Sequence, residues 1–145
     1  MSEQNRALIR RWFEEVWNKG NVEAIDEMFA ANGVSHDFVD EKGKPIRGIE
    51  DFKEIHKRYS SALSEIDVRV EDAIAEGDKV AVRCSVRARH SGEGLGVAAT
   101  GKPVEYTGMS IVRIRDGKIV DAWNNWDFMS LFQQVGALVK PGAPR

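Results

Sequence analysis

The sequence predicts an α+β fold in which helices come first and a curved, mostly antiparallel sheet follows. Up to Leu63, apolar side chains recur three or four residues apart, as they do on one face of a helix. From Ile66 onward the spacing changes to two, which is typical of strands with one buried face. The dipeptide Asp116-Gly117 separates two such runs and favours the tight turn of a β-hairpin. Helices that precede a long antiparallel meander imply a sheet covered on one face by those helices.

Three helices and one short strand are expected in the N-terminal part. In order, the pattern predicts a helix over residues 4–18, a helix over 22–29, a strand over 34–39, a turn-rich loop over 40–48 and a helix over 49–63. Gly20 supplies the stop of the first helix, and Asn21 is positioned to cap the second. Trp12 and Tyr59 lie on the core-facing stripes of the helices. Both are core residues by default, and we also take them as candidate ligand contacts.

Strands and one final helix are expected in the C-terminal part. They are a strand from Ile66 to a turn at 76–78, a strand over 80–90, a glycine-rich loop over 91–101, the hairpin around Asp116-Gly117 and a helix over 127–135. The glycine-rich loop joins strand to strand, so it offers no helix N-terminus to a phosphate group. We interpret it as a flexible flap over a cavity mouth, with an ordinary connecting loop as the alternative.

Length and composition exclude several classes of protein. A chain of 145 residues predicts a single domain, here residues 1–137, with a flexible tail over 138–145. The net charge of −2 and the lack of a basic stripe argue against a nucleic-acid partner. The single cysteine excludes an intrachain disulfide, and the histidines lack metal-ligand spacing, so no metal site is predicted. The polar N-terminus and the lack of a long apolar run predict no signal peptide, no membrane segment and a cytoplasmic location.

The hairpin carries the strongest functional signal. If Asp116-Gly117 is the whole loop, the pairing places Asp121, Trp123 and Asn125 on its apolar, core-facing side. Polar groups on such a face are costly unless paired, and a ligand cavity requires them. Desolvation there would raise the pKa of Asp121, which suits a general base. The alternative is a bulge that reverses the faces and leaves Asp121 in solvent or paired with an arginine.

Three further residues, Asp127, His90 and His36, are candidates for the same cavity. Asp127 directly precedes the last helix, so it can cap that helix, act as a base, or both. His90 ends an apolar strand face, where it could shuttle protons or simply bond to the glycine-rich loop. His36 is placed similarly on its short strand. Trp123 could stack on a planar ligand or pack under the helices. We therefore expect Asp121, Trp123, Asn125 and His90 to line one shared cavity.

The patterns GEGLGVAATGKPVEYTG and RIRDGKIVDAWNNWD, followed by LFQQVG, resemble the SnoaL-like polyketide cyclase (ester cyclase) family. The resemblance covers nearly the whole chain and implies an NTF2-like, cone-shaped α+β fold with an internal pocket. It also implies an intramolecular aldol condensation without metal or organic cofactor, in which an aspartate, here Asp121 or Asp127, is the acid/base. Relatives of this fold commonly dimerise through their outer sheet faces. Met109, Ile111 and Ala122 are expected on that face, consistent with a homodimer.

Together these observations predict cofactor-independent acid/base chemistry on a small, largely apolar carbonyl compound. In that mechanism an aspartate removes a proton next to a carbonyl, while His90, Asn125 or a water stabilises the enolate oxygen. The alternative from another class is a non-catalytic protein that binds a small molecule. Epoxide hydrolysis is disfavoured, because it needs an arginine beside the aspartate, and Arg113 and Arg115 are expected on the opposite face.

Overall fold

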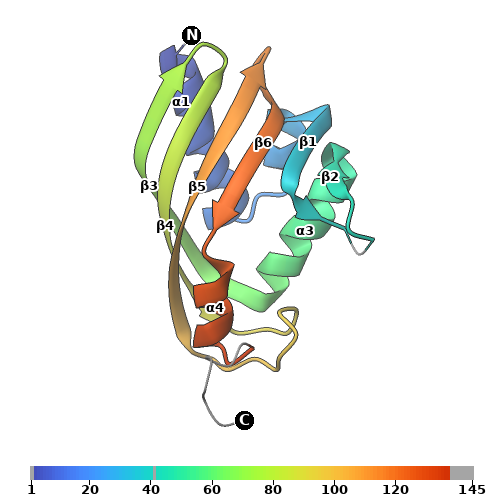
Figure 1. Cartoon of the computed structure of the whole chain (residues 1–145), viewed down its shortest axis with the longest axis vertical. Helices are drawn as coiled ribbons and strands as arrows, with labels where there is room; N and C mark the ends of the chain where they lie inside the picture. Colours follow the sequence, from blue (N-terminus) through green and yellow to red (C-terminus); the bar gives the residue numbers. More distant parts are fainter. Residues whose placement is uncertain (1, 41, 138–145) are drawn as a thin grey trace.

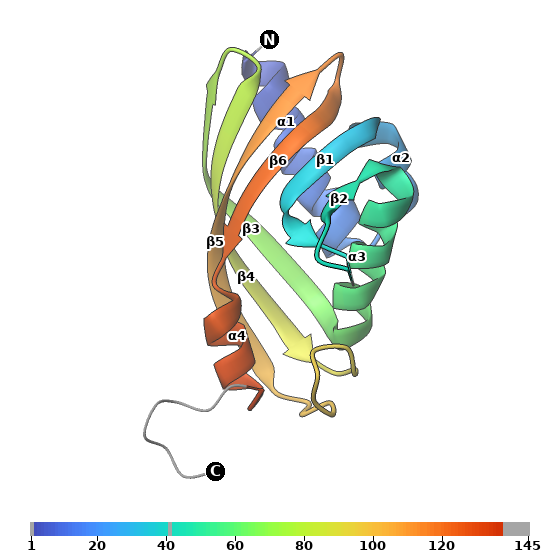
Figure 2. The same cartoon turned by 45° about the vertical axis from the view of Figure 1, so that its right-hand side comes forward.

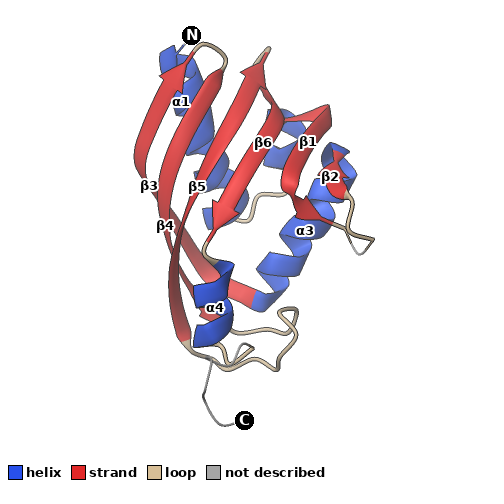
Figure 3. Cartoon of the chain, in the orientation of Figure 1, coloured by secondary structure: helices blue, strands red, loops and turns tan. Residues whose placement is uncertain are grey.

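The computed structural model describes residues 2–40 and 42–137, which form a curved six-stranded sheet with helices packed on one face (Figures 1 and 3). In chain order the elements are α1 (Ser2–Trp12), the π-helical segment η1 (Phe13–Asn18), α2 (Glu23–Met28), β1 (Phe29–Val39), β2 (Pro45–Arg47), α3 (Gly48–Ala62), β3 (Leu63–Glu76), β4 (Lys79–His90), β5 (Pro103–Arg115), β6 (Lys118–Trp126) and α4 (Phe128–Gln134). The predicted α+β fold is confirmed. The tail predicted at 138–145 lies outside the described residues.

The sheet is open and mostly antiparallel, as expected. Its strand order is β2-β1-β6-β5-β4-β3, so β2 and β3 are the two edges. Only the β1–β6 pair is parallel among the described strands. The continuous helix of α1 and η1 packs against β3 and β4, and α3 packs against β1 (Figure 2). The curvature and these two helices enclose the space in which a ligand site is expected.

The structure corrects three local predictions in the N-terminal part. Strand β1 begins at Phe29 and is longer than expected, and the loop after it contains the short strand β2. Asn21 does not cap α2, whose N-cap residue is Val22. The Asn21 amide instead donates to the carboxylate of Glu15. Spacing in the sequence could not indicate β2, because its three residues are defined by pairing with β1.

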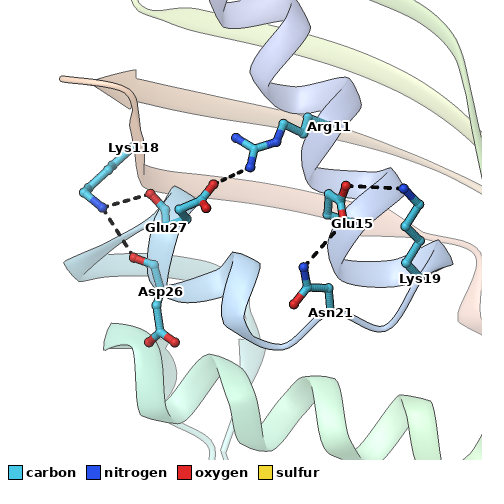
Figure 4. A network of polar contacts seen from close by, with 7 residues as sticks. All are labelled: Arg11, Glu15, Lys19, Asn21, Asp26, Glu27 and Lys118. Carbon is cyan, nitrogen blue, oxygen red and sulfur yellow. Dashed lines mark hydrogen bonds and ion pairs between the residues drawn. The ribbon is translucent and has the colours of Figure 1, made fainter.

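Helix α2 is held at its C-terminus by charged side chains from distant elements (Figure 4). Lys118 of β6 donates from Nζ to the carbonyl oxygens of Asp26, at 3.4 Å, and Glu27, at 2.9 Å. Arg11 of α1 pairs with the Glu27 carboxylate. A cation at a helix C-terminus is favourable, because the last carbonyl groups are unpaired and carry partial negative charge.

The β5–β6 hairpin contains the irregularity that decides which residues face inward. Its turn is as predicted: Asp116 and Gly117 have φ of 52° and 73°, and Ile114 pairs with Ile119. Beyond that pair the register shifts by one residue, so Arg113 pairs with Asp121. A bulge that adds one residue to a strand reverses the faces of every residue after it. The predicted orientation of Asp121, Trp123 and Asn125 is therefore wrong, and the alternative considered for this hairpin is correct.

The bulge in β6 has a counterpart in the parallel neighbour β1. The β1–β6 register also shifts, between the pairs Phe29–Ile119 and Val34–Asp121. At that level a Cβ on Gly33 would lie 3.0 Å from the carbonyl oxygen of Ile119 and 2.8 Å from the ring of Phe29. The close approach of the two strands thus depends on a glycine in β1, far from the hairpin in sequence.

Two apolar clusters occupy the interior. The larger cluster lies between the helices and the sheet and includes Ile9, Val16 and Ile25, each fully buried. The smaller cluster lies around Leu63, at the start of β3, and Leu131 of α4. No helix among the described residues is long and apolar enough to cross a membrane. The cytoplasmic location stays a prediction.

Candidate functional site

The most enclosed of the cavities in the described structure, called the main cavity below, lies between the inner face of the sheet and the helices. It encloses about 750 Å³ of space free of protein atoms, including the part that opens to solvent. Its walls come from α1, η1, α3, five of the strands and the start of α4. They are Ile9, Trp12, Phe13, Trp17, Phe29, Ser35, Phe38, Phe52, Tyr59, Leu63, Ile66, Val68, Val86, Tyr106, Ser110, Val112, Ile119, Ala122, Asn124, Trp126 and Phe128.

Aromatic rings form much of this wall and pack in two groups. Near α1, the ring centroids of Trp12 and Phe52 lie 5.2 Å apart. At the other end, Tyr59 and Phe128 stack with centroids 5.3 Å apart, and Tyr106 lies next to Phe128. Aromatic walls of this kind suit a flat, largely apolar ligand. Trp12 and Tyr59 were both predicted as candidate contacts, and both line the cavity.

A short series of hydrogen-bonded side chains lies on the inner face of the sheet. Trp126 donates from Nε1 to the side-chain oxygen of Asn124 at 3.2 Å, and the Asn124 amide donates to the Ser35 hydroxyl at 3.3 Å. Ser110 pairs with Asn124 across β5 and β6. Ser35 and Ser110 are buried. These groups are uncharged, and they give the apolar cavity a hydrogen-bonding patch on its sheet side.

The two tyrosines of the wall are phenols rather than phenolates. Burial raises the pKa of Tyr59, an effect that Arg58 partly opposes. Burial also raises the pKa of Tyr106, with a further contribution from Tyr59. Both side chains therefore present neutral hydroxyl groups at physiological pH, which can donate or accept a hydrogen bond.

Among residues 2–40 and 42–137, the cavity wall includes no aspartate, glutamate, histidine, lysine or arginine. Proton abstraction next to a carbonyl requires a base within hydrogen-bonding reach, directly or through one water. The described wall therefore offers hydrogen-bond donors and shape, but no side chain that titrates near neutral pH.

Asp121 lies on the outer face of the sheet, in contact with two basic side chains. Its carboxylate accepts from His36 Nε2 at 2.9 Å and from Arg113 at 3.0 Å. Burial alone would raise the pKa of Asp121, but the hydrogen bonds from His36 and Arg113 outweigh it and lower that pKa below its usual value. A lowered pKa makes the carboxylate a weaker base, contrary to the prediction from the sequence.

Trp123 and His36 share this outer face. The imidazole of His36 stacks on the indole of Trp123, with centroids 4.9 Å apart and planes 5° from parallel. The guanidinium of Arg113 lies 5.5 Å from the same ring. The structure thus brings together three predicted site residues, Asp121, Trp123 and His36, but on the side of the sheet away from the cavity. Asn125 is exposed on that side too.

His90 lies on the inner face, as predicted, but it is not part of the cavity wall. It is fully buried. Its Nδ1 contacts the Thr100 hydroxyl at 2.9 Å and accepts from the Thr100 amide at 3.2 Å. His90 therefore contacts the glycine-rich loop, which was its alternative role, and faces away from Asp121. The prediction that His90 and Asp121 line one shared cavity is wrong.

Asp127 caps α4, because its carboxylate accepts from the backbone N–H of Ser130 at 3.0 Å. It lies off the cavity wall. The glycine-rich loop does not line the cavity either. The backbone N–H groups of Ser91 and Gly92 both donate to the carbonyl oxygen of Ala62 at 3.1 Å, which ties the loop to the end of α3.

Four polar wall residues were not predicted from the sequence: Ser35, Ser110, Asn124 and Trp126. One signal for them was present. Gly108 interrupts the alternating pattern of β5, and a glycine inside a strand often marks the close approach of another group. Here a Cβ at position 108 would lie 2.2 Å from the Trp126 ring, so the glycine makes room for that indole.

Comparisons with known proteins agree with this architecture. The family model described as SnoaL-like polyketide cyclase matches residues 7–135. No curated protein is significantly similar in sequence. Three solved structures illustrate the similarity. IdmH, a proposed polyketide cyclase from Streptomyces antibioticus, is 32% identical with a TM-score of 0.80 and covers 92% of this chain and 99% of its own.

AclR, a proposed hydroxylase from Streptomyces galilaeus, is 25% identical with a TM-score of 0.83 over 100% of this chain and 87% of its own. A protein of ketosteroid isomerase-like fold from Catenulispora acidiphila, in complex with trimethylamine, is 21% identical with a TM-score of 0.72 over 94% of this chain and 97% of its own. The fold is therefore shared by proteins to which different activities are ascribed.

Proposed function

This chain belongs to the SnoaL-like polyketide cyclase family, and we propose that it binds a small, largely apolar carbonyl compound in the main cavity and promotes its ring closure. The observation that carries the proposal is the composition of the cavity wall. Aromatic and aliphatic side chains surround a few uncharged polar groups. Such a wall favours an apolar, flat molecule with a hydrogen-bonding oxygen.

The proposed reaction is an intramolecular aldol condensation. A base removes a proton from the carbon next to one carbonyl group, the enolate carbon attacks a second carbonyl carbon of the same molecule, and the resulting alkoxide takes up a proton. Loss of a second α-proton and of the new hydroxyl group, together as water, then gives the conjugated enone. Because the described wall has no carboxylate or imidazole, water or hydroxide is the base in this proposal. The protein contributes by holding the chain in a folded conformation, which brings the two reacting carbons together.

Heptane-2,6-dione is a suitable test substrate, because its intramolecular aldol condensation gives a conjugated cyclohexenone with a distinct ultraviolet absorbance. We expect the protein to accelerate this reaction. The Val112→Phe variant, which adds a ring to the cavity wall, should abolish the acceleration. Ile111→Phe places the same ring on the outer face, where Ile111 is 45% exposed, and should retain it.

The pH dependence separates this mechanism from one with a side-chain base. With water or hydroxide as the base, the accelerated rate should rise steadily with pH between about pH 5 and 9, without the plateau that an enzyme base produces. The Asp121→Asn and Asp127→Asn variants should both retain the activity. A plateau that disappears in either variant would show that the aspartate acts as a base and would overturn this part of the proposal.

A non-catalytic binding protein is the second candidate, and the described wall favours it because it includes no side chain that titrates near neutral pH. Exchange of the α-protons of heptane-2,6-dione for deuterium, followed by NMR, distinguishes the two. Accelerated exchange or ring closure supports the cyclase. Binding with neither supports the binding protein.

We also propose that the chain forms a homodimer through its outer sheet face. Met109 and Ile111 are 59% and 45% exposed there, and Trp123 pairs with Ile111 on the same face. Ala122, expected in this strip, is buried on the inner face because of the bulge. Burial of exposed apolar side chains stabilises such a contact. Sedimentation should show a dimer for the wild type and a monomer for the Met109→Lys, Ile111→Lys double variant. A monomeric wild type, or a variant that stays fully dimeric, would exclude this interface.

A further inference from the structure

The orientation of the Asn124 amide is fixed by its neighbours. The indole N–H of Trp126 can only donate, so the atom that it contacts at 3.2 Å must be the amide oxygen. The amide nitrogen then faces Ser35, to which it donates at 3.3 Å. The backbone N–H of Asn124 is also bonded to the Asp37 carboxylate, which anchors this part of β6 to β1. The side-chain nitrogen of Asn124, which carries the donor hydrogens, therefore faces Ser35, while its oxygen faces Trp126.

Three donor hydrogens at this point of the wall are not used in the bonds that join Trp126, Asn124 and Ser35. An amide nitrogen carries two hydrogens, and Ser35 uses one of them. The Ser35 hydroxyl accepts that bond and keeps its own hydrogen, and Ser35 is fully buried. Ser110 lies opposite Asn124 on β5 and is 4% exposed. The Ser110 hydroxyl carries one further donor hydrogen.

We propose that Asn124, Ser35 and Ser110 form a binding site for one oxygen of the ligand, a carbonyl or enolate oxygen, and that Trp126 is the positioning residue that orients the amide. Spare donors in an apolar wall are costly unless an acceptor meets them. The wall described here has no cation, so a permanent carboxylate would be buried unpaired. The site therefore selects an uncharged carbonyl compound. This inference rests on the proposed function, because it names the feature of the ligand that the cavity recognises.

Three small probes of similar shape test the site on the wild-type protein. Acetophenone has a carbonyl oxygen, α-methylstyrene has a methylene group in its place, and benzoate carries a charge. We expect acetophenone to bind about fivefold to tenfold more tightly than α-methylstyrene, the ratio that one neutral hydrogen bond gives. Benzoate should bind more weakly than both. Infrared spectra of acetophenone with an isotope-labelled carbonyl should show a lower carbonyl stretching frequency when it is bound than in an apolar solvent.

Variants assign the effect to the named residues. Asn124→Leu should remove the preference for acetophenone and the infrared shift, while binding of α-methylstyrene stays within about twofold. Asn125→Leu makes the same substitution on the next residue of β6, on the outer face, and should change neither. Trp126→Phe keeps a ring but removes the indole N–H. It should broaden and weaken the infrared shift, because the amide can then rotate.

The outcomes separate this inference from the function on which it rests. If acetophenone and α-methylstyrene bind the wild type equally, with no infrared shift, the oxygen site is wrong while the apolar cavity still binds ligands. If neither probe binds, both proposals are wrong. Should Asn124→Leu fail to fold, the comparison of probes on the wild type and the Trp126→Phe spectrum still decide the question.

Discussion

Substitution of Gly108 by alanine is the most direct test of the packing that positions Trp126 beside Asn124. A Cβ at this position would lie 2.2 Å from Cε3 and 2.4 Å from Cδ2 of the Trp126 indole. Carbon atoms in contact lie about 3.5–4.0 Å apart, so the ring would have to move by about 1.5 Å. Such a movement strains a packed interior and breaks the bond from Trp126 to Asn124.

The expected cost follows from three contributions. Overpacking of an interior costs about 1–3 kcal/mol. Loss of the indole hydrogen bond costs about 1 kcal/mol. The smaller entropy of alanine in the unfolded chain offsets about 0.4–1 kcal/mol. We therefore expect Gly108→Ala to lower the free energy of unfolding by about 2 kcal/mol, measured by urea denaturation monitored by circular dichroism.

A double variant supplies the control. Trp126→Leu removes the ring that the new methyl group would meet, so Gly108→Ala should cost little in that background. The coupling energy between the two positions should be about 1–2 kcal/mol in favour of the double variant. If Gly108→Ala is as stable as the wild type, or equally destabilising in both backgrounds, the indole does not lie against this strand and does not orient the Asn124 amide.

Three further predictions concern stability. Because the pKa of Asp121 is lowered in the folded state, its ionisation adds stability above its unfolded pKa. The stability advantage of the wild type over Asp121→Asn should therefore shrink as the pH falls through the acid range below about 4, in urea titrations at a series of pH values. Burial lowers the pKa of His56, with a partly opposing hydrogen bond to Val16. The unfolded chain then binds more protons, so the wild type should lose stability as the pH falls below about 6.5, and His56→Gln should lose less; equal slopes would contradict this. Gly92→Ala would place a Cβ 1.8 Å from the carbonyl oxygen of Ser61. Thermal unfolding should show a loss of more than about 2 kcal/mol, and an unchanged melting temperature would refute the close approach.

Local patterns in the sequence predicted most of the elements correctly. The helices α1 and α3 and the strands β3 to β6 follow from the spacing of apolar residues, and the turn at Asp116-Gly117 follows from its two residue types. The prediction failed where an element is defined by a partner strand. Strand β2 exists through its pairing with β1, and β1 begins at Phe29, directly after α2, rather than at Val34.

Which residues of β6 face the cavity depends on a one-residue shift in its pairing with β5. Alternation of side chains is a local property, so the sequence determined that the residues of β6 would divide between an apolar and a polar face. It could not determine which set faces inward, because that depends on a bulge next to Ile119. Alternation counted from the turn therefore placed Asp121 inward, whereas the bulge places Asn124 and Trp126 there.

What the sequence by itself determined was the α+β class, the order of its main elements and an aromatic interior that includes Trp12 and Tyr59. What only the tertiary structure decided was the identity of the polar groups in that interior. Contacts such as that between His36 and Asp121, 85 residues apart, form only when β1 and β6 lie side by side. The packing of β6 between two strands fixes its register, and the register decides which polar groups face the cavity.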